Sequence, residues 1–219
     1  DEASAAQSAK VIEALKANCE HGKPVPDDSA ELLDLLEKTG QNMQSVIEGF
    51  LNTESLETGQ ANPQYKSVPF NQIVTKSLKA NQEYASKKGV KLVGDLQPDL
   101  PMVEADEFRL TQVLDNLIGN AMKFSPQETT TVVRTRSDGE YVYAEISDGG
   151  PGLSPEDMDK LFMKNARLSN QPTGDETSTG VGLSISKQLV EQHRGRIGAH
   201  NNASQGATFW FGVPIRHHS

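Results

Sequence analysis

Three polar side chains at helical spacing could hold a magnesium ion together with phosphate. Asn116, Asn120 and Lys123 stand at positions i, i+4 and i+7, so they share one face of a predicted helix. An amide oxygen is a hard ligand suited to Mg²⁺, which commonly keeps waters and substrate phosphates among its ligands. A lysine ammonium neutralises phosphate charge. The alternative interpretation is a solvated polar face opposite an apolar one.

A carboxylate followed by glycines could recognise a purine base. Asp148 comes directly after the alternating stretch 141–147 and begins the sequence Asp-Gly-Gly-Pro-Gly, which contains Gly150 and Gly152. Glycines let the backbone approach a ligand closely, and a carboxylate can accept a hydrogen bond from an exocyclic amine such as that of adenine. An ordinary turn would use the same residue types.

A second glycine cluster could bind the phosphates of a nucleotide. Thr179-Gly180-Val181-Gly182-Leu183 opens a predicted helix, and the free backbone N–H groups at a helix N-terminus attract anions. A lone Gly-x-Gly is weak evidence for such a site. The preceding segment, 164–178, is polar and poor in apolar residues, which predicts a mobile lid able to fold over a nucleotide.

These residues need a mixed set of elements to position them. Hydrophobic periodicity predicts helices at 70–88, 108–124 and 181–192, and strands at 90–96, 102–104, 129–136, 141–147, 195–201 and 207–213. The turn at 137–140, with Gly139, joins two of the strands into a hairpin. Intermixed helices and antiparallel strands predict an α+β fold, a two-layer sandwich with the sheet on one side and helices on the other.

Residues 1–60 form a separate predicted unit. They carry 12 acidic and 4 basic residues, so nearly all of the overall net charge of −9 lies there. A stripe that includes Ile12 and Leu15 predicts a first helix, and residues 21–26 break it. The second predicted helix repeats its apolar stripe at spacings of three and four, interrupted by one glycine: Leu33, Leu36, Gly40, Met43, Ile47 and Phe50.

This stripe predicts an antiparallel helical hairpin, 1–60, that forms a homodimer as a four-helix bundle, since two helices cannot bury it alone. The alternative is that the hairpin packs against the rest of its own chain. Residues 61–69, with Pro63 and Pro69, are the predicted linker, and 70–219 the second domain.

Composition excludes several classes of protein. Among the 219 residues no apolar run approaches the length of a membrane span, and no concentrated Lys/Arg face suits nucleic acid. The single cysteine, Cys19, cannot form an internal disulfide, which is typical of a reducing compartment. We therefore expect a cytoplasmic location, no nucleic-acid partner and no contact of this fragment with a membrane.

Taken together, the motifs resemble the ATP-binding domain of the GHKL superfamily and, within it, that of the sensor histidine kinases. Residues 112–125 resemble the N box of that family, 148–152 its G1 box, 161–167 its F box and 179–183 its G2 box. The ending 206–211 resembles its last strand. The resemblance covers about 70 to 215 and implies ATP and Mg²⁺ as cofactors.

The resemblance also implies a role for each residue. Asn120, with Asn116 beside it, would coordinate Mg²⁺, and Asp148 would bond the adenine amine, with Thr208 supporting the base through water. Gly180 and Gly182 would present backbone to the phosphates. The full implied nucleotide-binding set is Asn116, Asn120, Lys123, Asp148, Gly150, Gly152, Arg167, Thr179, Gly180, Val181, Gly182, Leu183 and Thr208.

The activity that the resemblance implies is phosphoryl transfer from Mg·ATP to a histidine of the dimer bundle and on to a response-regulator receiver domain. In the family that histidine lies on the first helix of the hairpin, but residues 1–10 contain none, and His21 sits in the loop at the opposite end. No catalytic residue is therefore identified: the phosphoacceptor either precedes Asp1, in a larger and membrane-bound sensor for example, or has been lost.

Two other hypotheses remain. The first is a degenerate kinase that acts as a scaffold, binding nucleotide or a receiver domain without catalysis. The second is another GHKL member, such as a topoisomerase, chaperone or mismatch-repair ATPase. Those proteins use a glutamate of the N-box helix to hydrolyse ATP, whereas here Asp115 precedes Asn116 and no glutamate follows Glu107 in this helix.

Overall fold

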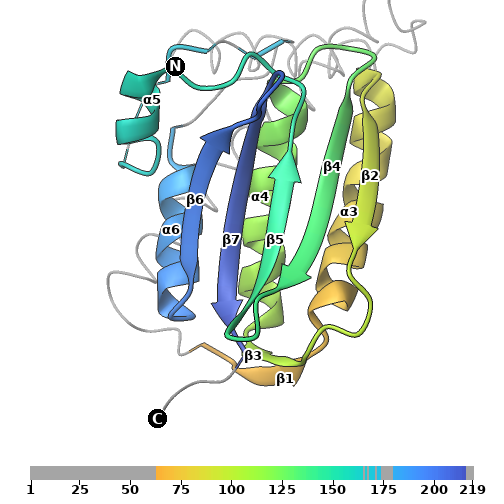
Figure 1. The fold of residues 1–219 in the computed structure, drawn as a ribbon, viewed down its shortest axis with the longest axis vertical. Helices are drawn as coiled ribbons and strands as arrows, with labels where there is room; N and C mark the ends of the chain where they lie inside the picture. The colour runs from red at the N-terminus through yellow and green to blue at the C-terminus, as the bar shows by residue number, and fades with distance from the viewer. Residues whose placement is uncertain (1–62, 165, 167, 171, 174–179, 216–219) are drawn as a thin grey trace, which may run out of the picture. The chain divides into compact units, whose positions relative to one another are not determined.

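The computed structural model describes residues 63–164, 166, 168–170, 172, 173 and 180–215 (Figure 1). The chain divides into two compact units, Asp1–Glu54 and Ser55–Ser219. The predicted hairpin and its dimer seam lie outside the described residues, and so do Arg167 and Thr179. In the described part of the chain, no helix is both long and apolar enough to cross a membrane.

The second unit alternates helices and strands largely as the hydrophobic pattern predicts. In the described residues the order is β1 (Lys66–Val68), α3 (Phe70–Lys88), β2 (Lys91–Leu96), β3 (Val103–Ala105), α4 (Glu107–Lys123), β4 (Thr130–Ser137), β5 (Tyr141–Ser147), α5 (Pro155–Lys160), α6 (Gly182–Gln192), β6 (Arg196–Asn201) and β7 (Ala207–Pro214). The predicted helices and strands are confirmed to within one or two residues at each end.

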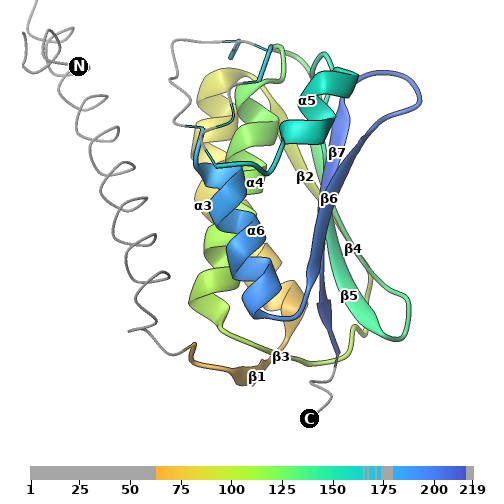
Figure 2. The ribbon, with the colours of Figure 1, turned by 90° about the vertical axis from the view of Figure 1, so that its left-hand side faces the viewer.

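Five strands form one mixed sheet in the order β2-β4-β5-β7-β6. The β2–β4 pair is parallel, and the other neighbours are antiparallel. Helices α3, α4 and α6 cover one face of this sheet, as the side view shows (Figure 2). The predicted two-layer sandwich is therefore confirmed for this unit.

Strand register decides which side chains reach the helices. In the β5–β7 pair, Ile146 stands opposite Phe209 and Ala144 opposite Phe211, and all four are buried. They form the core with the apolar face of α4, which includes Leu114. Because side chains alternate along a strand, the residues between them point to the other face of the sheet.

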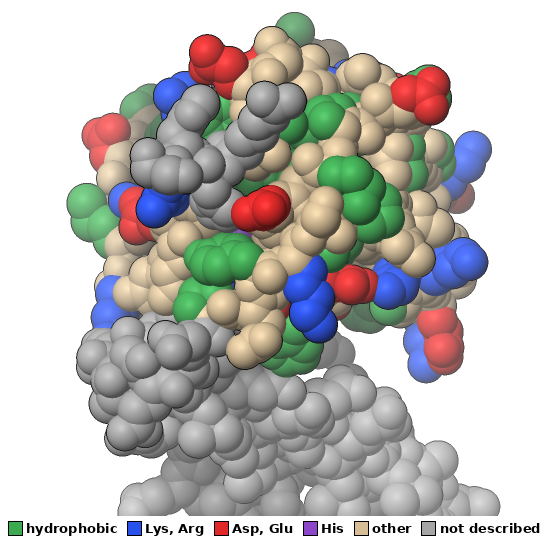
Figure 3. Space-filling model, turned by 90° about the horizontal axis from the view of Figure 1, so that it is seen from below, with side chains coloured by type: hydrophobic (Ala, Val, Ile, Leu, Met, Phe, Trp, Pro, Cys, Tyr) green, Lys and Arg blue, Asp and Glu red, His purple; other side chains and the backbone are tan. Residues whose placement is uncertain are grey.

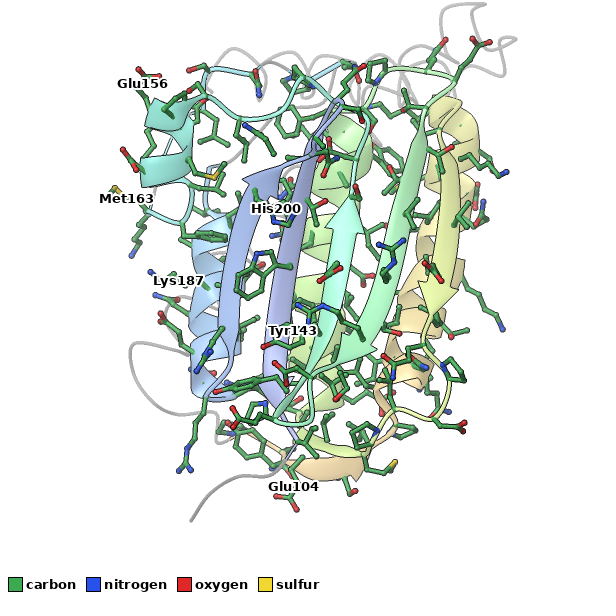
Figure 4. The ribbon with its side chains drawn as sticks, viewed as in Figure 1. Glu104, Tyr143, Glu156, Met163, Lys187 and His200 are labelled. Atoms are coloured by element: carbon green, nitrogen blue, oxygen red, sulfur yellow. The ribbon has the colours of Figure 1, made fainter. Side chains whose placement is uncertain are left out.

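The outer face of the sheet carries aromatic and charged side chains. Tyr143 and Trp210 contact each other with ring centroids 6.1 Å apart, and the Arg136 guanidinium lies 4.0 Å from the Tyr143 ring centre. Tyr143 and His200 are both labelled on this face in Figure 4. The stacked guanidinium covers apolar ring surface, so this face is half-buried without a second layer of helices.

A buried histidine links helices α4 and α6 at the end of the domain opposite the glycine loops. His193, directly after α6, is fully buried; its Nδ1 lies 2.7 Å from the Leu189 carbonyl, and its Nε2 accepts from the Asp106 N–H at 3.1 Å. A carbonyl only accepts, so Nδ1 carries the proton and the ring is neutral. His193 therefore links the end of α6 to Asp106, the N-cap of α4. Seen from below, this end shows hydrophobic, basic and acidic side chains interspersed (Figure 3).

Two elements were not predicted. Strand β1 lies inside the segment 61–69 that the prolines predict to be a linker, and it pairs with β3. Helix α5 has a recognisable start, since the Ser154 side chain accepts from the Asp157 N–H and Pro155 occupies the first turn. Its short length hides it from a periodicity argument.

Candidate functional site

Helix α4 brings its asparagine face against the start of α6. The Asn116 Nδ2 donates to Ser186 Oγ at 2.8 Å. The other end of the same amide, Oδ1, lies so close to Gly182 that a β-carbon there would collide with it. The predicted N-box and G2-box residues are therefore adjacent, and the Asn116 carbonyl oxygen points toward the N-terminus of α6.

The last turn of α4 places the remaining candidates of that face. Asn120 and Lys123 are both half-buried and lie one and two turns beyond Asn116. The Lys123 carbonyl accepts from Thr173, both from its N–H at 3.1 Å and from Oγ1 at 3.0 Å. Thr173 thus holds part of the predicted lid segment against the end of this helix.

The Asp148 carboxylate is buried at the end of β5, with 8% of the residue exposed. Its Oδ1 accepts from the Gly150 N–H at 2.9 Å and from the Ala207 N–H at 3.1 Å. Among described residues no donor is recorded for Oδ2, so this oxygen can accept from a ligand. Burial raises the pKa of Asp148 above the usual aspartate range, because it outweighs the two backbone hydrogen bonds.

The loop after Asp148 lies directly on the end of α4. A β-carbon at Gly150 would lie 2.9 Å from the Phe124 carbonyl oxygen, and Gly149 donates to Ser125 Oγ at 3.4 Å. Gly152 has a φ of +78°, a conformation that glycine adopts without strain. The predicted G1 box and N box therefore form one continuous surface, with glycine required at Gly150 for close approach.

The start of α6 presents backbone donors. Gly180 has a φ of +69°, Val181 is the N-cap residue, and no side chain caps the helix. The first N–H groups of a helix have no partner inside it, so those of Gly182 and Leu183 can face an anion. Leu183 also packs against the hydrophobic core, which fixes the helix start.

The described residues contain no cluster of three or more His, Cys, Asp or Glu side chains that could hold a metal ion. The amide of Asn116 lies beside the start of α6, and Asn120 stands one turn further along the same face of α4. Carbonyl-type oxygens together with phosphate oxygens suit Mg²⁺. The residues present therefore fit a metal that arrives with a nucleotide.

Thr208 does not fit its expected role. In the register of the sheet it stands opposite Ser147 on one side and His200 on the other, and Ser147 and Asp148 point to opposite faces. Thr208 therefore lies on the outer face, where its hydroxyl donates to Asn202 Oδ1 at 2.6 Å. On the Asp148 side of the sheet, the residue that reaches the carboxylate is Ala207, through its backbone.

Thr208 instead lines a cavity on the outer face of about 280 Å³. The cavity crosses four strands and ends at the turn after β6. Its lining residues are Val132, Arg134, Glu145, Ser147, His200, Asn202 and Thr208. The cavity lies on the face of the sheet opposite α4, and Asn202 at its end donates to the Asp148 carbonyl.

Sequence reasoning missed Asn170, which contacts the glycine loop, and Asp157, which holds Ser169 of the predicted lid segment. Asn170 donates from Nδ2 to the Gly152 carbonyl at 2.5 Å. The buried Asp157 accepts from the Ser169 N–H at 3.1 Å. Burial acts to raise the pKa of Asp157, but hydrogen bonds from Ser169, Lys160 and Ser154 outweigh it and lower the pKa. Ser154-Pro155 is a helix-start signature that could have pointed to Asp157.

Comparisons with known proteins identify the family to which this chain is similar. A family model described as histidine kinase-, DNA gyrase B-, and HSP90-like ATPase matches residues 105–217. The circadian input-output histidine kinase CikA of Synechococcus elongatus is 30% identical over 193 residues, which are 87% of this chain and 26% of CikA. The adaptive-response sensory kinase SasA of a Synechococcus species is 39% identical over 132 residues, 58% of this chain and 33% of that protein. This chain thus spans a minor part of such relatives.

Solved structures share the fold. Full-length ShkA in complex with AMPPNP superposes with a TM-score of 0.73 at 24% identity, covering 97% of this chain and 45% of ShkA. The histidine kinase ThkA, solved with the response regulator TrrA, gives a TM-score of 0.69 at 19% identity, covering 95% of this chain and 58% of ThkA. At such identities the likeness establishes the fold.

Proposed function

Because this chain belongs to the histidine kinase-, DNA gyrase B-, and HSP90-like ATPase family and carries a sensor histidine kinase core, we propose that it binds Mg·ATP and donates the γ-phosphoryl group to a histidine. From that histidine the group would pass to an aspartate of a response-regulator receiver domain. The names of two relatives support the kinase part of the proposal, since CikA is named a histidine kinase and SasA a sensory kinase.

One observation carries the proposal: helix α4 touches both ligand-facing loops at once. Its Asn116 meets Gly182 at the start of α6, and its C-terminal Phe124 carbonyl meets Gly150 of the loop after Asp148. A base bound at the carboxylate and phosphates bound at the helix start would therefore lie along one helix. This arrangement suits a nucleotide with a base at one end and charged groups at the other.

Each residue then has a task that its chemistry supports. Asp148 Oδ2 accepts from the adenine amine, and the N–H groups at Gly182 and Leu183 face phosphate oxygens. Asn116 and Asn120 would hold the magnesium, which supplies charge neutralisation when it is bound. Lys123 adds positive charge, and Gly180, Val181, Arg167 and Thr179 complete the proposed set.

Catalysis in this proposal is mainly positioning. The bond between the γ-phosphorus and its bridging oxygen breaks, a bond from phosphorus to the histidine nitrogen forms, and ADP leaves with the electron pair. Such a transfer asks the protein for orientation and charge stabilisation rather than covalent chemistry. The phosphoacceptor histidine is not among the residues identified here, and the hairpin 1–60 is the proposed dimer and phosphotransfer unit.

One feature of the sequence supports the alternative of a scaffold without kinase activity. His21 is the one histidine among residues 1–60, and the sequence around it, 21–26, is rich in glycine and proline and predicts a loop. Incubation with γ-labelled ATP, using a chain extended by its native upstream sequence, separates the two functions. Label on a histidine eliminates the scaffold, whereas bound nucleotide without label eliminates the kinase.

The geometry disfavours a hydrolytic ATPase of the same superfamily. Asp115 is the acid beside Asn116, but its Oδ1 accepts from Asn81 Nδ2 of α3 at 2.9 Å. Burial raises the pKa of Asp115. Asn116 contacts α6 on another side of the helix, so the Asp115 carboxylate faces α3 rather than the proposed phosphates.

Calorimetric titration with ATP, with and without Mg²⁺, tests nucleotide binding directly. We expect binding that Mg²⁺ strengthens, and we expect Asn120→Ala to reduce the Mg²⁺-dependent part more than the Mg²⁺-free part. Absence of binding at millimolar nucleotide would refute the proposal. An Asn120→Ala protein that responds to Mg²⁺ like the wild type would remove this residue from the proposed metal site.

Gly182→Ala should weaken Mg·ATP binding by about tenfold, the size of one lost charge-assisted contact. The new methyl group collides with Asn116 Oδ1, so the amide must rotate and lose its bond to Ser186. Affinity is measured by titration, and folding by thermal melting.

Gly119→Ala is the matched control, because a β-carbon at Gly119 meets nothing within 4 Å. Alanine is the better helix former by about 1 kcal/mol, so this variant should melt higher and bind normally. If Gly182→Ala bound Mg·ATP as tightly as Gly119→Ala, the proposed role of Asn116 in the nucleotide site would be contradicted.

A further inference from the structure

The loop that follows β5 is held by hydrogen bonds from side chains of the turn that follows β6. We call residues 148–153 the adenine loop, since the proposed function places adenine at Asp148. The turn begins with two consecutive asparagines, Asn201 at the end of β6 and Asn202 directly after it. Both asparagines form side-chain hydrogen bonds to the adenine loop.

Asn201 holds the far end of the adenine loop. Its Oδ1 accepts from the Leu153 N–H at 2.7 Å, and its Nδ2 donates to the Leu153 carbonyl at 2.8 Å. The amide thus satisfies both backbone groups of one residue, as a neighbouring strand would. Gly152 allows the approach, because a β-carbon there would lie 3.0 Å from Asn201 Oδ1.

Asn202 holds the near end. Its Nδ2 lies 3.1 Å from each of three acceptors: the Asp148 carbonyl, Ser147 Oγ and the Gln205 carbonyl. Its Oδ1 accepts from Thr208 Oγ1 at 2.6 Å. One side chain therefore joins the end of β5, the start of β7 and the turn between β6 and β7.

The same turn orients the carboxylate. The Asp148 N–H donates to the Ala207 carbonyl at 2.9 Å, and the Ala207 N–H donates to Asp148 Oδ1 at 3.1 Å. Gln205 Nε2 also reaches the Gly149 carbonyl at 3.2 Å. A shift of the turn would move the donor of Oδ1 and, with it, the direction of Oδ2.

We propose that Asn201 and Asn202 are positioning residues that hold the adenine loop in its nucleotide-binding shape before the nucleotide arrives. The proposal rests on the proposed function. Both side chains are neutral, so they fix the loop without adding charge beside the carboxylate that must receive the adenine amine. Holding a binding loop in its bound shape strengthens affinity because less freedom is lost on binding.

The test compares Asn201→Ala, Asn202→Ala and the double variant with Asn71→Ala. Asn71 is a matched control: its Nδ2 donates to the Gln97 carbonyl at 2.8 Å and its Oδ1 accepts from Thr135 Oγ1 at 2.8 Å. The Asn71→Ala variant therefore loses a comparable bridging amide at the start of α3, outside the adenine loop. ATP and AMP affinities are measured by calorimetry well below the melting temperature of each variant.

We expect the double variant to bind ATP about tenfold more weakly than the wild type, and AMP by the same factor, with the Mg²⁺ dependence of ATP binding unchanged. Asn71→Ala should bind both normally even if it melts lower.

A double variant with wild-type affinity for both nucleotides at low temperature overturns the inference and leaves the proposed function intact. A wild-type chain that binds no ATP overturns the proposed function and the inference together. If the double variant does not fold, hydrogen exchange on the nucleotide-free single variants decides. Asn201→Ala should lose protection at the Leu153 N–H, and unchanged protection there contradicts the proposal.

Discussion

Asp148→Asn should reduce ATP affinity by about 10- to 100-fold, as expected for loss of a hydrogen bond to a charged acceptor. The substitution keeps the shape of the side chain, and an amide oxygen can still accept from the Gly150 and Ala207 N–H groups. The group facing the adenine amine then becomes an NH₂, which cannot accept. Affinity is measured by calorimetric titration.

The same substitution should leave the melting temperature unchanged or higher at neutral pH. Because burial raises the pKa of Asp148 in the folded state, the native chain holds more protons than the unfolded one between the unfolded and folded pKa values. Stability therefore falls as pH rises through that window, and the asparagine variant lacks this loss. Thermal melts of both proteins across acidic and neutral pH measure it.

Two outcomes would contradict this account. Wild-type affinity in Asp148→Asn would show that the carboxylate does not contact the base. A large fall in melting temperature with unchanged affinity would assign Asp148 to the fold instead. In the wild type, ATP affinity should weaken on acidification, because protonation of Asp148 removes the charged acceptor. This weakening should begin at a pH above the pKa of an ordinary aspartate, because burial raises the pKa of Asp148.

Gly206→Ala should destabilise the domain by about 3 kcal/mol, from overpacking against rigid backbone together with a strained φ. Gly206 has a φ of +88°. A β-carbon there would collide with the Asp148 carbonyl oxygen, which cannot rotate away as a side chain would. Urea denaturation measures the change in unfolding free energy.

Gly139→Ala separates the two causes. Gly139 has a φ of +93°, but a β-carbon there meets nothing within 4 Å. This variant should cost about 1 kcal/mol, the part due to the φ angle alone. Equal losses at the two positions would show that the contact between Gly206 and Asp148 contributes nothing.

Local patterns were enough to predict the long elements. Helix α4 carries an apolar stripe at helical spacing, and the β4–β5 hairpin carries Gly139 at its turn. Both signals lie within a short window of sequence. Strand β1 has no such local signal. Its three residues are extended because they pair with β3, which lies far along the chain.

The position of Thr208 shows why register escapes sequence reasoning. Thr208 and Ala207 are neighbours, and a shift of one residue in the β5–β7 pairing would exchange the faces that they occupy. The pairing of Ser147 with Thr208 is set by contacts across the sheet. Asn201 and Asn202 were missed for a related reason, since their partners at 148–153 are distant in sequence.

The strand order makes the last segment of the domain indispensable. Strand β7 comes last in the chain order of the described strands, yet it occupies an interior place between β5 and β6. A chain emerging from the ribosome therefore cannot complete the sheet until Ala207–Pro214 has been synthesised. A nonsense mutation just before this strand would leave β6 unpaired and remove Phe209 and Phe211 from the core, so loss of β7 should abolish folding of this domain.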